Sequence, residues 1–359
     1  MEGPGRLAVA ELPLPAGPPP GGAVVRVLAN GICGSDWDLY SGVLTQLRGR
    51  PVPFPLVPGH EPIGVIESID AAATEAWGVG VGDRVAIGST VTCGQCEGCR
   101  GARGAACRHG VTYSMISVAE GPGLWGGLAQ HMVLLPGSCV VAVPDDLADA
   151  DAALFNPLAN AIHWSIERGG VGLGDDVLVL GSGQRGLCCV IAAKAAGARK
   201  VLVTGLASDR HKLDLAMALG ATATIVADEE DVVARAQELT GGEGVDVVVD
   251  TVPGAVRPIY DGVEALRLGG TLVVAGLRSG PADGFPLELF RSKQLHMVGA
   301  SATTPRAVQM AIDMLARSDL PLDRFHTHVL GLDDSERAMR LLGGCEPDES
   351  PIHVLVVPT

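Results

Sequence analysis

Four cysteines stand close together in the stretch "TCGQCEGCRGARGAACR", with the spacing C-x2-C-x2-C-x7-C. They are Cys93, Cys96, Cys99 and Cys107. Two-residue gaps let neighbouring thiolates converge on one ion, and four thiolates complete the tetrahedral shell of a structural zinc site. Four thiolates also suit an iron–sulfur cluster, and a pair of them suits a disulfide. We favour zinc, and because its closed shell cannot receive a substrate, the chemistry must lie elsewhere.

A second set of possible metal ligands is divided between two short segments, "GICGSDWD" and "PGHEPIG". They contain Cys33, His60 and Glu61. A thiolate, an imidazole and a carboxylate form a mixed shell that suits zinc with an open position, as a catalytic site requires. Taken singly, each residue has a more ordinary explanation, since Cys33 is typical of a small buried side chain and His60 of a hydrogen-bonded loop histidine.

A glycine-rich loop in "VLVLGSGQRG" has the G-x-G-x-x-G spacing of a dinucleotide-binding site, with Gly181, Gly183 and Gly186. The first glycine permits a tight turn, the second lets the backbone approach a pyrophosphate, and the third lets the helix pack on the strand. The N–H groups at the helix start, where Gln184 and Arg185 lie, then receive the phosphates.

The residue that selects the coenzyme is expected about 20 residues beyond the glycines, where an acid usually binds the adenosine ribose. In "VTGLASDRHK" that place is held by Gly205, with Asp209 and Arg210 a few residues further on. Asp209 would bind the ribose of NAD if the loop folds back, whereas Arg210 would neutralise the extra phosphate of NADP. A solvated surface loop explains both side chains equally well. We expect NAD, with NADP as the alternative.

The elements that position these residues belong to two domains. Residues 1–157 contain short apolar runs between Gly- and Pro-rich turns, which predict an irregular and mostly antiparallel β domain. From about residue 158 apolar strands alternate with helical stretches, as in "DDVLVLG", "KVLVTG" and "VDVVVDT", which indicates an α/β fold with a doubly wound parallel sheet over 158–301. Residues 302–359, with a helix in "PRAVQMAIDMLARS", polar connectors and a last strand in "HVLVVP", return to the first domain.

Composition limits the class of partner. Apolar residues make up 47% of the chain and charged ones 19%, as in a compact protein with a large core. The net charge of −15 and the absence of any basic run argue against nucleic acid and anionic membranes. The first residues, "MEGPGRLAVAELPLP", show no secretory signal, and no apolar stretch is long enough to span a membrane, so we expect a cytoplasmic protein.

Together, "GICGSD", "GHE", "GDRV" at 82–85, the four-cysteine lobe at about 90–110 and the glycine loop resemble the zinc-dependent medium-chain alcohol and polyol dehydrogenases over nearly the whole chain. The resemblance implies a chaperonin-10-like (GroES-like) catalytic domain and a Rossmann domain. It also implies that Cys33, His60 and Glu61 bind a catalytic zinc, with Ser35 beside the substrate oxygen and Asp36 orienting His60. Two zinc ions per chain follow. We expect a homodimer or homotetramer.

The chain departs from the family's pattern in three places. Asn156, in "FNPLANAIHW", stands where relatives have a further ligand or a glutamate, so we expect it beside the metal shell or against the substrate. Asp38 stands where many relatives have a relay histidine; either it carries a proton as a carboxylate, or the proton takes another route. The start, "MEGPGRLAV", falls inside the family's first strand, as a shortened or misassigned start would.

The resulting hypothesis is reversible hydride transfer between a secondary alcohol or polyol, or the corresponding ketone, and NAD(P). Zinc lowers the pKa of bound water toward ~7 in favourable sites and would act similarly on an alcohol. A zinc-free quinone or enone reductase of the same fold is an alternative, but such relatives lack the ligand residues. A non-catalytic nucleotide-binding zinc or thiol sensor is another, and it would leave Cys33, His60 and Glu61 without a role.

Overall fold

The computed structural model describes residues 1–47, 51–100, 107–278, 280–317 and 319–358. Their contacts divide the chain into two compact units, unit 1 (Met1–Asn156 with Thr303–Thr359) and unit 2 (Pro157–Ala302). The division falls within helix α6 (Phe155–Ile162), which continues into a π-helical turn over His163–Arg168. Within these ranges no helix is long and apolar enough to cross a membrane.

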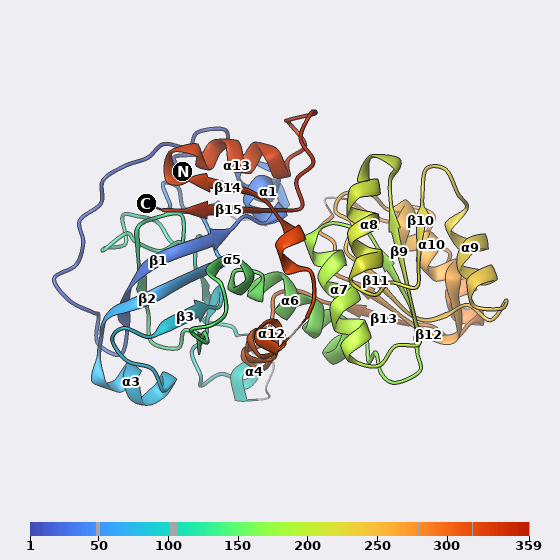
Figure 1. Ribbon diagram of the computed structural model, residues 1–359, viewed down its shortest axis with the longest axis horizontal. Helices are drawn as coiled ribbons and strands as arrows, with labels where there is room; N and C mark the ends of the chain where they lie inside the picture. The colour runs from blue at the N-terminus through green and yellow to red at the C-terminus, as the bar shows by residue number, and fades with distance from the viewer. Residues whose placement is uncertain (48–50, 101–106, 279, 318, 359) are drawn as a thin grey trace. The chain divides into compact units, whose positions relative to one another are not determined.

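Unit 1 is built on a mixed sheet in which strand β1 is central (Figure 1). β1 pairs antiparallel with β2, β6 and β15, while β14 and β15, from the end of the chain, run parallel to each other. The strand order is β14-β15-β1-β2-β3-β7, with β6 pairing β1 off this path. The strands are β1 (Ala23–Gly31), β2 (Pro62–Ile69), β3 (Arg84–Ile87), β6 (His131–Leu134), β7 (Val140–Ala142), β14 (His326–Gly331) and β15 (His353–Val357), and a separate pair is formed by β4 (Thr90–Val91) and β5 (Val111–Thr112).

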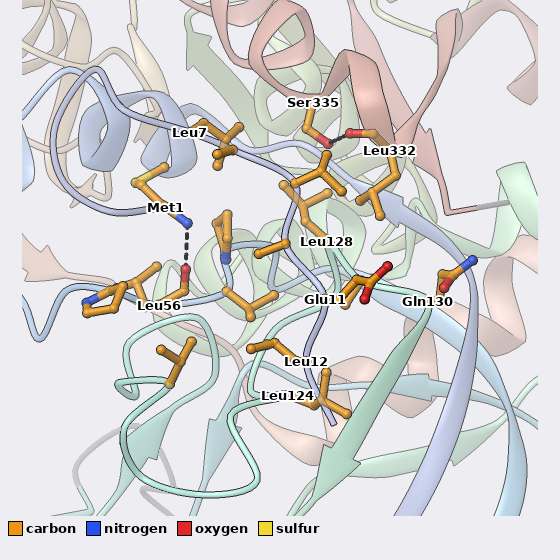
Figure 2. Close-up of a pocket in the computed structure, with 18 of the residues that line it drawn as sticks. Met1, Leu7, Glu11, Leu12, Leu56, Leu124, Leu128, Gln130, Leu332 and Ser335 are labelled. Atoms are coloured by element: carbon orange, nitrogen blue, oxygen red, sulfur yellow. Dashed lines mark hydrogen bonds between the residues drawn. The ribbon is translucent and has the colours of Figure 1, made fainter. Parts of the chain in front are cut away.

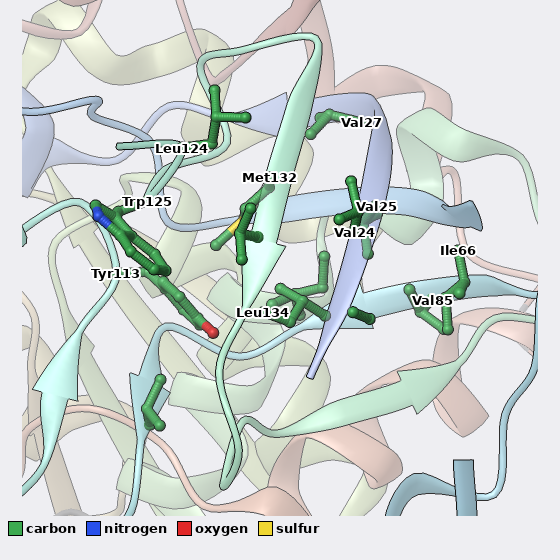
Figure 3. Packing of buried hydrophobic residues seen from close by; sticks show 14 of the residues in the cluster. Val24, Val25, Val27, Ile66, Val85, Tyr113, Leu124, Trp125, Met132 and Leu134 are labelled. Carbon is green, nitrogen blue, oxygen red and sulfur yellow. The ribbon is translucent and has the colours of Figure 1, made fainter. Parts of the chain in front are cut away.

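The core of this sheet is formed by inward-facing aliphatic residues and two aromatic rings (Figure 3). Val25, Met132 and Leu134 are fully buried, and Trp125 closes the cluster beside Tyr113. The Tyr113 hydroxyl lies 2.6 Å from Ser138 Oγ and accepts the N–H of Leu135, so the one polar atom of this ring is satisfied where it is buried.

The helices of unit 1 are short. Cys33 directly precedes one of them, α1, and a second, α13, packs against α1. Helix α1 and helix α13 pack together on β15 around a second core that contains Ile32, Leu39, Met339 and Val354. Because Ile32 is held in that core, the next residue has a fixed position. The helices of unit 1 are α1 (Gly34–Tyr40), α2 (Val43–Leu47), α3 (Ala71–Trp77), α4 (Glu97–Arg100), α5 (Asp149–Ala152), α12 (Pro305–Arg317) and α13 (Ser335–Leu342).

Unit 2 contains a parallel six-stranded sheet in the order β10-β9-β8-β11-β12-β13. The central strand β8 is buried along its whole length, as expected for a sheet covered by helices on both faces. The predicted fold class, a Rossmann sheet with a β-rich domain, is confirmed. The strands are β8 (Asp176–Leu180), β9 (Lys200–Gly205), β10 (Ala223–Val226), β11 (Val245–Asp250), β12 (Leu266–Val274) and β13 (His296–Gly299), and the helices α7 (Gln184–Ala195), α8 (Arg210–Ala218), α9 (Val232–Leu239), α10 (Arg257–Ala265) and α11 (Leu287–Ser292).

One segment differs from its prediction. The residues between α12 and β15, expected to be polar connectors, include strand β14 and helix α13. The strand was not predicted because "HTHVLG" contains few apolar residues and its positions are half-buried or exposed. The helix was hidden because only one face of "SERAMRLL", with Ala338, Met339 and Leu341, enters the core.

Candidate active site

Cys33, His60 and Glu61 are brought together by the pairing of β1 with β2. Cys33 follows the end of β1, and His60 and Glu61 precede the start of β2. The two strands are antiparallel with Asn30 opposite Pro62, so the end of one lies beside the start of the other. The thiol sulfur, an imidazole nitrogen and a carboxylate oxygen consequently lie within 4.8 Å of one another.

Asp36 connects two of these residues. Its Oδ2 accepts the backbone N–H of Cys33 at 2.9 Å, and its Oδ1 lies 3.2 Å from His60 Nδ1. A carboxylate can only accept, so Nδ1 carries the proton and Nε2 is the nitrogen available to a metal. Asp36 is 1% exposed, so these contacts are shielded from water.

The same contacts affect the pKa of His60. Burial by itself lowers that pKa, but the charge and hydrogen bond of Asp36, with a smaller contribution from Cys33, raise it well above the usual value. A proton and a metal ion therefore compete for Nε2.

Three further residues surround this group. The Ser35 hydroxyl is 3.2 Å from Cys33 Sγ and 3.3 Å from His60 Nε2. Asn156 is buried and donates from Nδ2 to the backbone oxygen of His60 at 3.3 Å. Asp38, on the same helix as Ser35, is half-buried, and burial raises its pKa.

The donor set fits a zinc ion. Donors about 2.0–2.3 Å from one ion lie ~3–4 Å apart in a tetrahedral shell, close to the spread of these three atoms. Cys33 is 3% exposed and Glu61 is completely buried. Sulfur, nitrogen and carboxylate oxygen from three residues leave a position for a further ligand, as in catalytic zinc sites.

The four cysteines of the lobe also converge. The Sγ atoms of Cys96 and Cys99 are 3.5 Å apart, and Cys93–Cys99 and Cys96–Cys107 are both 3.9 Å apart. A Zn–S bond of ~2.3 Å places the sulfurs of a tetrahedral shell about 3.8 Å apart, so the spacing fits zinc. The sulfurs are not bonded to each other. Residues 101–106 of the predicted lobe lie outside the described residues.

Backbone hydrogen bonds prepare this lobe for a cation. The Cys93 N–H donates to Cys107 Sγ and the Cys96 N–H donates to Cys93 Sγ. Backbone donors from Cys99 and Arg108 lower the pKa of Cys96 to about 6. Burial and hydrogen bonds with the neighbouring thiols raise the pKa of Cys99 to about 12, so the four sulfurs differ in their affinity for a proton.

In unit 2 the glycine loop joins β8 to α7. Gly181 has φ +97°, which a side chain rarely adopts, and a Cβ on Gly186 would lie 1.9 Å from the Gly181 carbonyl oxygen. At Gly183, the residue before α7, a Cβ would meet no atom within 4 Å. Open space above the first turn of a helix is where a pyrophosphate would be received. Gln184 is buried, and the Arg185 guanidinium lies over the Trp164 ring.

The charged residues after β9, where the coenzyme-selecting residue was predicted, form ion pairs with one another and with Glu229. Asp209 accepts the N–H of Leu206 at 3.2 Å and the Lys212 ammonium at 2.8 Å. Arg210 is ion-paired with Glu229 at 2.5 Å. A Cβ on Gly205 would lie 2.6 Å from Ser182 Oγ, so an acid at this strand end would require that side chain to shift.

Near the metal group, His353 and Asp151 were not considered from the sequence, and His326 was interpreted as an ordinary structural histidine. His353, in β15, is completely buried, and His326 and Asp151 continue from it in a chain of hydrogen bonds. Burial and the nearby His326 lower the pKa of His353 to about 3, so the ring is neutral. The available signal was a single histidine inside the apolar run "PIHVLVVP".

Unit 1 also contains a groove of about 880 Å³ beneath residues 7–14 (Figure 2). Leu7, Leu12, Leu124 and Leu128 line it, and Met1 donates from its amino group to the Leu56 carbonyl oxygen at 2.7 Å. None of its lining residues is a candidate metal ligand, so we assign the chemistry to the cysteine–histidine–glutamate group.

Comparison with known proteins agrees with this geometry. Residues 19–145 match the model of the alcohol dehydrogenase GroES-like domain, and residues 186–317 match that of zinc-binding dehydrogenases. A Mycobacterium tuberculosis protein named probable alcohol dehydrogenase is 39% identical over 100% of this chain and 97% of its own length. An L-threonine 3-dehydrogenase of Rhizobium johnstonii is 32% identical over 88% of this chain and 86% of its own.

A similar solved structure is that of an alcohol dehydrogenase from Thermus sp. ATN1. It is 29% identical, with a TM-score of 0.86, and the match covers 100% of this chain and 99% of that one. The chain therefore belongs to the zinc-dependent medium-chain dehydrogenases.

Proposed function

We propose that the protein is a zinc-dependent oxidoreductase that transfers hydride between a secondary alcohol or polyol and NAD(P). The observation that carries the proposal is the convergence of Cys33, His60 and Glu61 within 4.8 Å in unit 1, together with the open glycine loop of unit 2. Relatives named alcohol dehydrogenase and L-threonine 3-dehydrogenase support oxidation of a CH–OH group.

Each residue around the metal group has a separate proposed role in the reaction. Zinc, when bound, supplies a Lewis acid that lowers the pKa of a substrate hydroxyl. Ser35 Oγ, which lies between the ligand atoms of Cys33 and His60, accepts the hydroxyl proton and passes it outward. Asp36 holds His60 with Nε2 unprotonated toward the metal, and Asn156 fixes the backbone of His60. Asp38, with its raised pKa, is the proposed outer proton carrier.

We propose NAD as the coenzyme. Arg210 and Lys212, in the first turn of α8, are both ion-paired, Arg210 to Glu229 and Lys212 to Asp209. A third carboxylate, Asp228, accepts the N–H of Ala207 at 2.8 Å. A 2′-phosphate would enter a loop whose positive charge is already neutralised, whereas ribose hydroxyls add no charge. The ratio of kcat/KM for NAD to that for NADP should therefore exceed one, and a ratio below one would refute this choice.

We propose two zinc ions per chain, one in each cysteine-containing group, and self-association into a dimer or tetramer. Support for self-association comes from β13, the edge strand of the unit 2 sheet, where His296, Met297 and Gly299 are exposed. An exposed parallel edge offers unpaired backbone groups to a second copy. Sedimentation or light scattering measures the oligomeric state, and a monomer at micromolar concentration would contradict this part.

The test of the function is metal counting combined with a substrate screen. Secondary alcohols, polyols and sugars are incubated with NAD or NADP while absorbance of the reduced coenzyme is followed. Cys33→Ser should reduce zinc from two ions to one per chain and abolish turnover without unfolding the protein. The matched control is Cys345→Ser, because Cys345 is an exposed free cysteine outside both groups. Full activity in Cys33→Ser would refute the catalytic assignment.

A further inference from the structure

A buried pair of histidines lies behind the metal group in unit 1. His326 and His353 are opposite one another in the parallel pair β14–β15, with Nδ1 atoms 3.0 Å apart. On its other side His326 Nε2 lies 2.8 Å from Asp151 Oδ1, on α5. His353 is completely buried, whereas the Asp151 side chain is 27% exposed, so the chain of contacts leads inward from the surface.

The inner end of this chain and Glu61 border the same space beside Gly31. The Nε2 atom of His353 is buried and has no hydrogen-bond partner among the described residues. A Cβ built on Gly31 would lie 2.9 Å from that nitrogen and 2.7 Å from Glu61 Oε2. The two atoms therefore share the space left by the missing side chain of Gly31, next to the carboxylate that belongs to the metal group.

The donors and acceptors along the chain can be assigned from its outer end inward. The carboxylate of Asp151 only accepts, so His326 Nε2 donates to it. For His353 Nε2 to donate toward Glu61, its Nδ1 must accept a proton from His326 Nδ1. In this arrangement both ring nitrogens of His326 donate, Nδ1 to His353 and Nε2 to Asp151. Asp151 thus orients the hydrogen bonds of the buried His353.

We propose that Asp151, His326 and His353 form a hydrogen-bonded chain whose inner nitrogen, His353 Nε2, faces the Glu61 carboxylate and positions it as a ligand of the metal ion. A donor behind a carboxylate ligand fixes the rotamer of the ligand and takes up part of its charge, which sets how tightly the metal is held. His353 is a positioning residue, since it acts through Glu61. The inference rests on the proposed metal site.

The test measures the metal rather than turnover alone. Zinc affinity of the site is determined by competition with a chelator, and the absorption bands of the Co²⁺-substituted protein report the geometry of the ligands. His353→Leu and His326→Leu should each weaken binding at this site about 10–100-fold and shift the cobalt bands. Zinc in the four-cysteine lobe should remain. His353→Gln, which retains an N–H, should recover part of the loss.

Two further variants make the result decisive. Gly31→Ala keeps the side chains of Asp151, His326 and His353 but places a methyl group between His353 and Glu61. It should therefore also lower the zinc affinity of the site. His328→Leu is the control, because His328 lies on the same strand and contacts Thr327 and Glu349 instead. Folded His353→Leu and Gly31→Ala with wild-type zinc affinity and cobalt bands would overturn the inference while leaving the proposed function intact. A wild-type chain that binds only the lobe metal would overturn both.

Discussion

At the scale of the residue, one carboxylate organises the candidate site. Asp36 receives the N–H of Cys33 and holds His60 Nδ1, so it positions a sulfur ligand and a nitrogen ligand together. The residues of the site could be identified from "GICGSD" and "GHE", because both segments carry polar groups that β structure alone does not need. Their meeting depends on strand register, which adjacent sequence does not contain.

Asp36→Asn is expected to weaken zinc binding at the Cys33–His60–Glu61 group by about 10–100-fold and to lower kcat/KM in proportion. An amide presents an N–H as well as an oxygen, so it no longer fixes the tautomer of His60. Chelator competition measures the first effect and steady-state kinetics the second. Asp70→Asn is the control, since Asp70 accepts an N–H at the start of α3 without touching a ligand. Equal zinc affinities in the two variants would contradict the assigned role.

At the scale of the element, two glycines in the turn between β8 and α7 have different expected roles, one in coenzyme binding and one in folding. Gly183→Ala should raise the KM for NAD at least tenfold with an unchanged melting temperature, because the added methyl group meets no protein atom but occupies the space proposed for the pyrophosphate. Gly186→Ala should instead destabilise the fold, because its methyl group would lie 1.9 Å from the Gly181 carbonyl oxygen. Kinetics and thermal unfolding of both variants check the contrast, and an unaffected KM in Gly183→Ala would exclude this binding mode.

The four-cysteine lobe is the second element whose role can be isolated. Cys96→Ser should remove the lobe zinc and lower the melting temperature by about 5–10 °C, because metal binding stabilises only the folded lobe. The other zinc and the coenzyme affinity should persist. Metal analysis and scanning calorimetry measure these changes, with Cys345→Ser as the reference. Loss of both metals together would show that the two groups are not independent.

At the scale of the whole molecule, the two textures of the sequence indicated the fold class correctly. Continuous apolar runs such as "VLVL" predicted buried parallel strands, and the structure buries them on both faces. The prediction failed for the segment before β15, because β14 carries few apolar residues and α13 is a short helix of which one face alone enters the core. The contact of His326 with His353 was missed for the same reason, because it exists only when β14 pairs with β15.

The buried ring of His353 predicts an acid sensitivity of the fold. Its pKa is lowered to about 3, whereas an unfolded histidine titrates near ~6.5. Between these values the unfolded chain binds a proton that the folded chain does not, so stability is complete above ~6.5 and falls as the pH is lowered. From pH 6.5 to 4.5 the loss amounts to about 2 kcal/mol.

His353→Gln should flatten this dependence by up to about one proton. Urea unfolding followed by tryptophan fluorescence at several pH values measures it, since Trp37, Trp77 and Trp125 all belong to unit 1. His328→Gln should retain the wild-type slope. Parallel curves for wild type and His353→Gln would show that the ring is protonated in the folded state as well.

The crowding of Gly205 against Ser182 has a practical consequence for redesign. Grafting the usual ribose-binding acid onto the end of β9 requires a single change on paper, Gly205→Asp, but its first carbon would lie 2.6 Å from a hydroxyl oxygen that belongs to the phosphate loop. The side chains of Ser182 and Leu213, which is 3.0 Å away, would have to shift or be made smaller, for instance with Ser182→Gly. The choice between NAD and NADP at this strand end is thus tied to the packing of the neighbouring side chains.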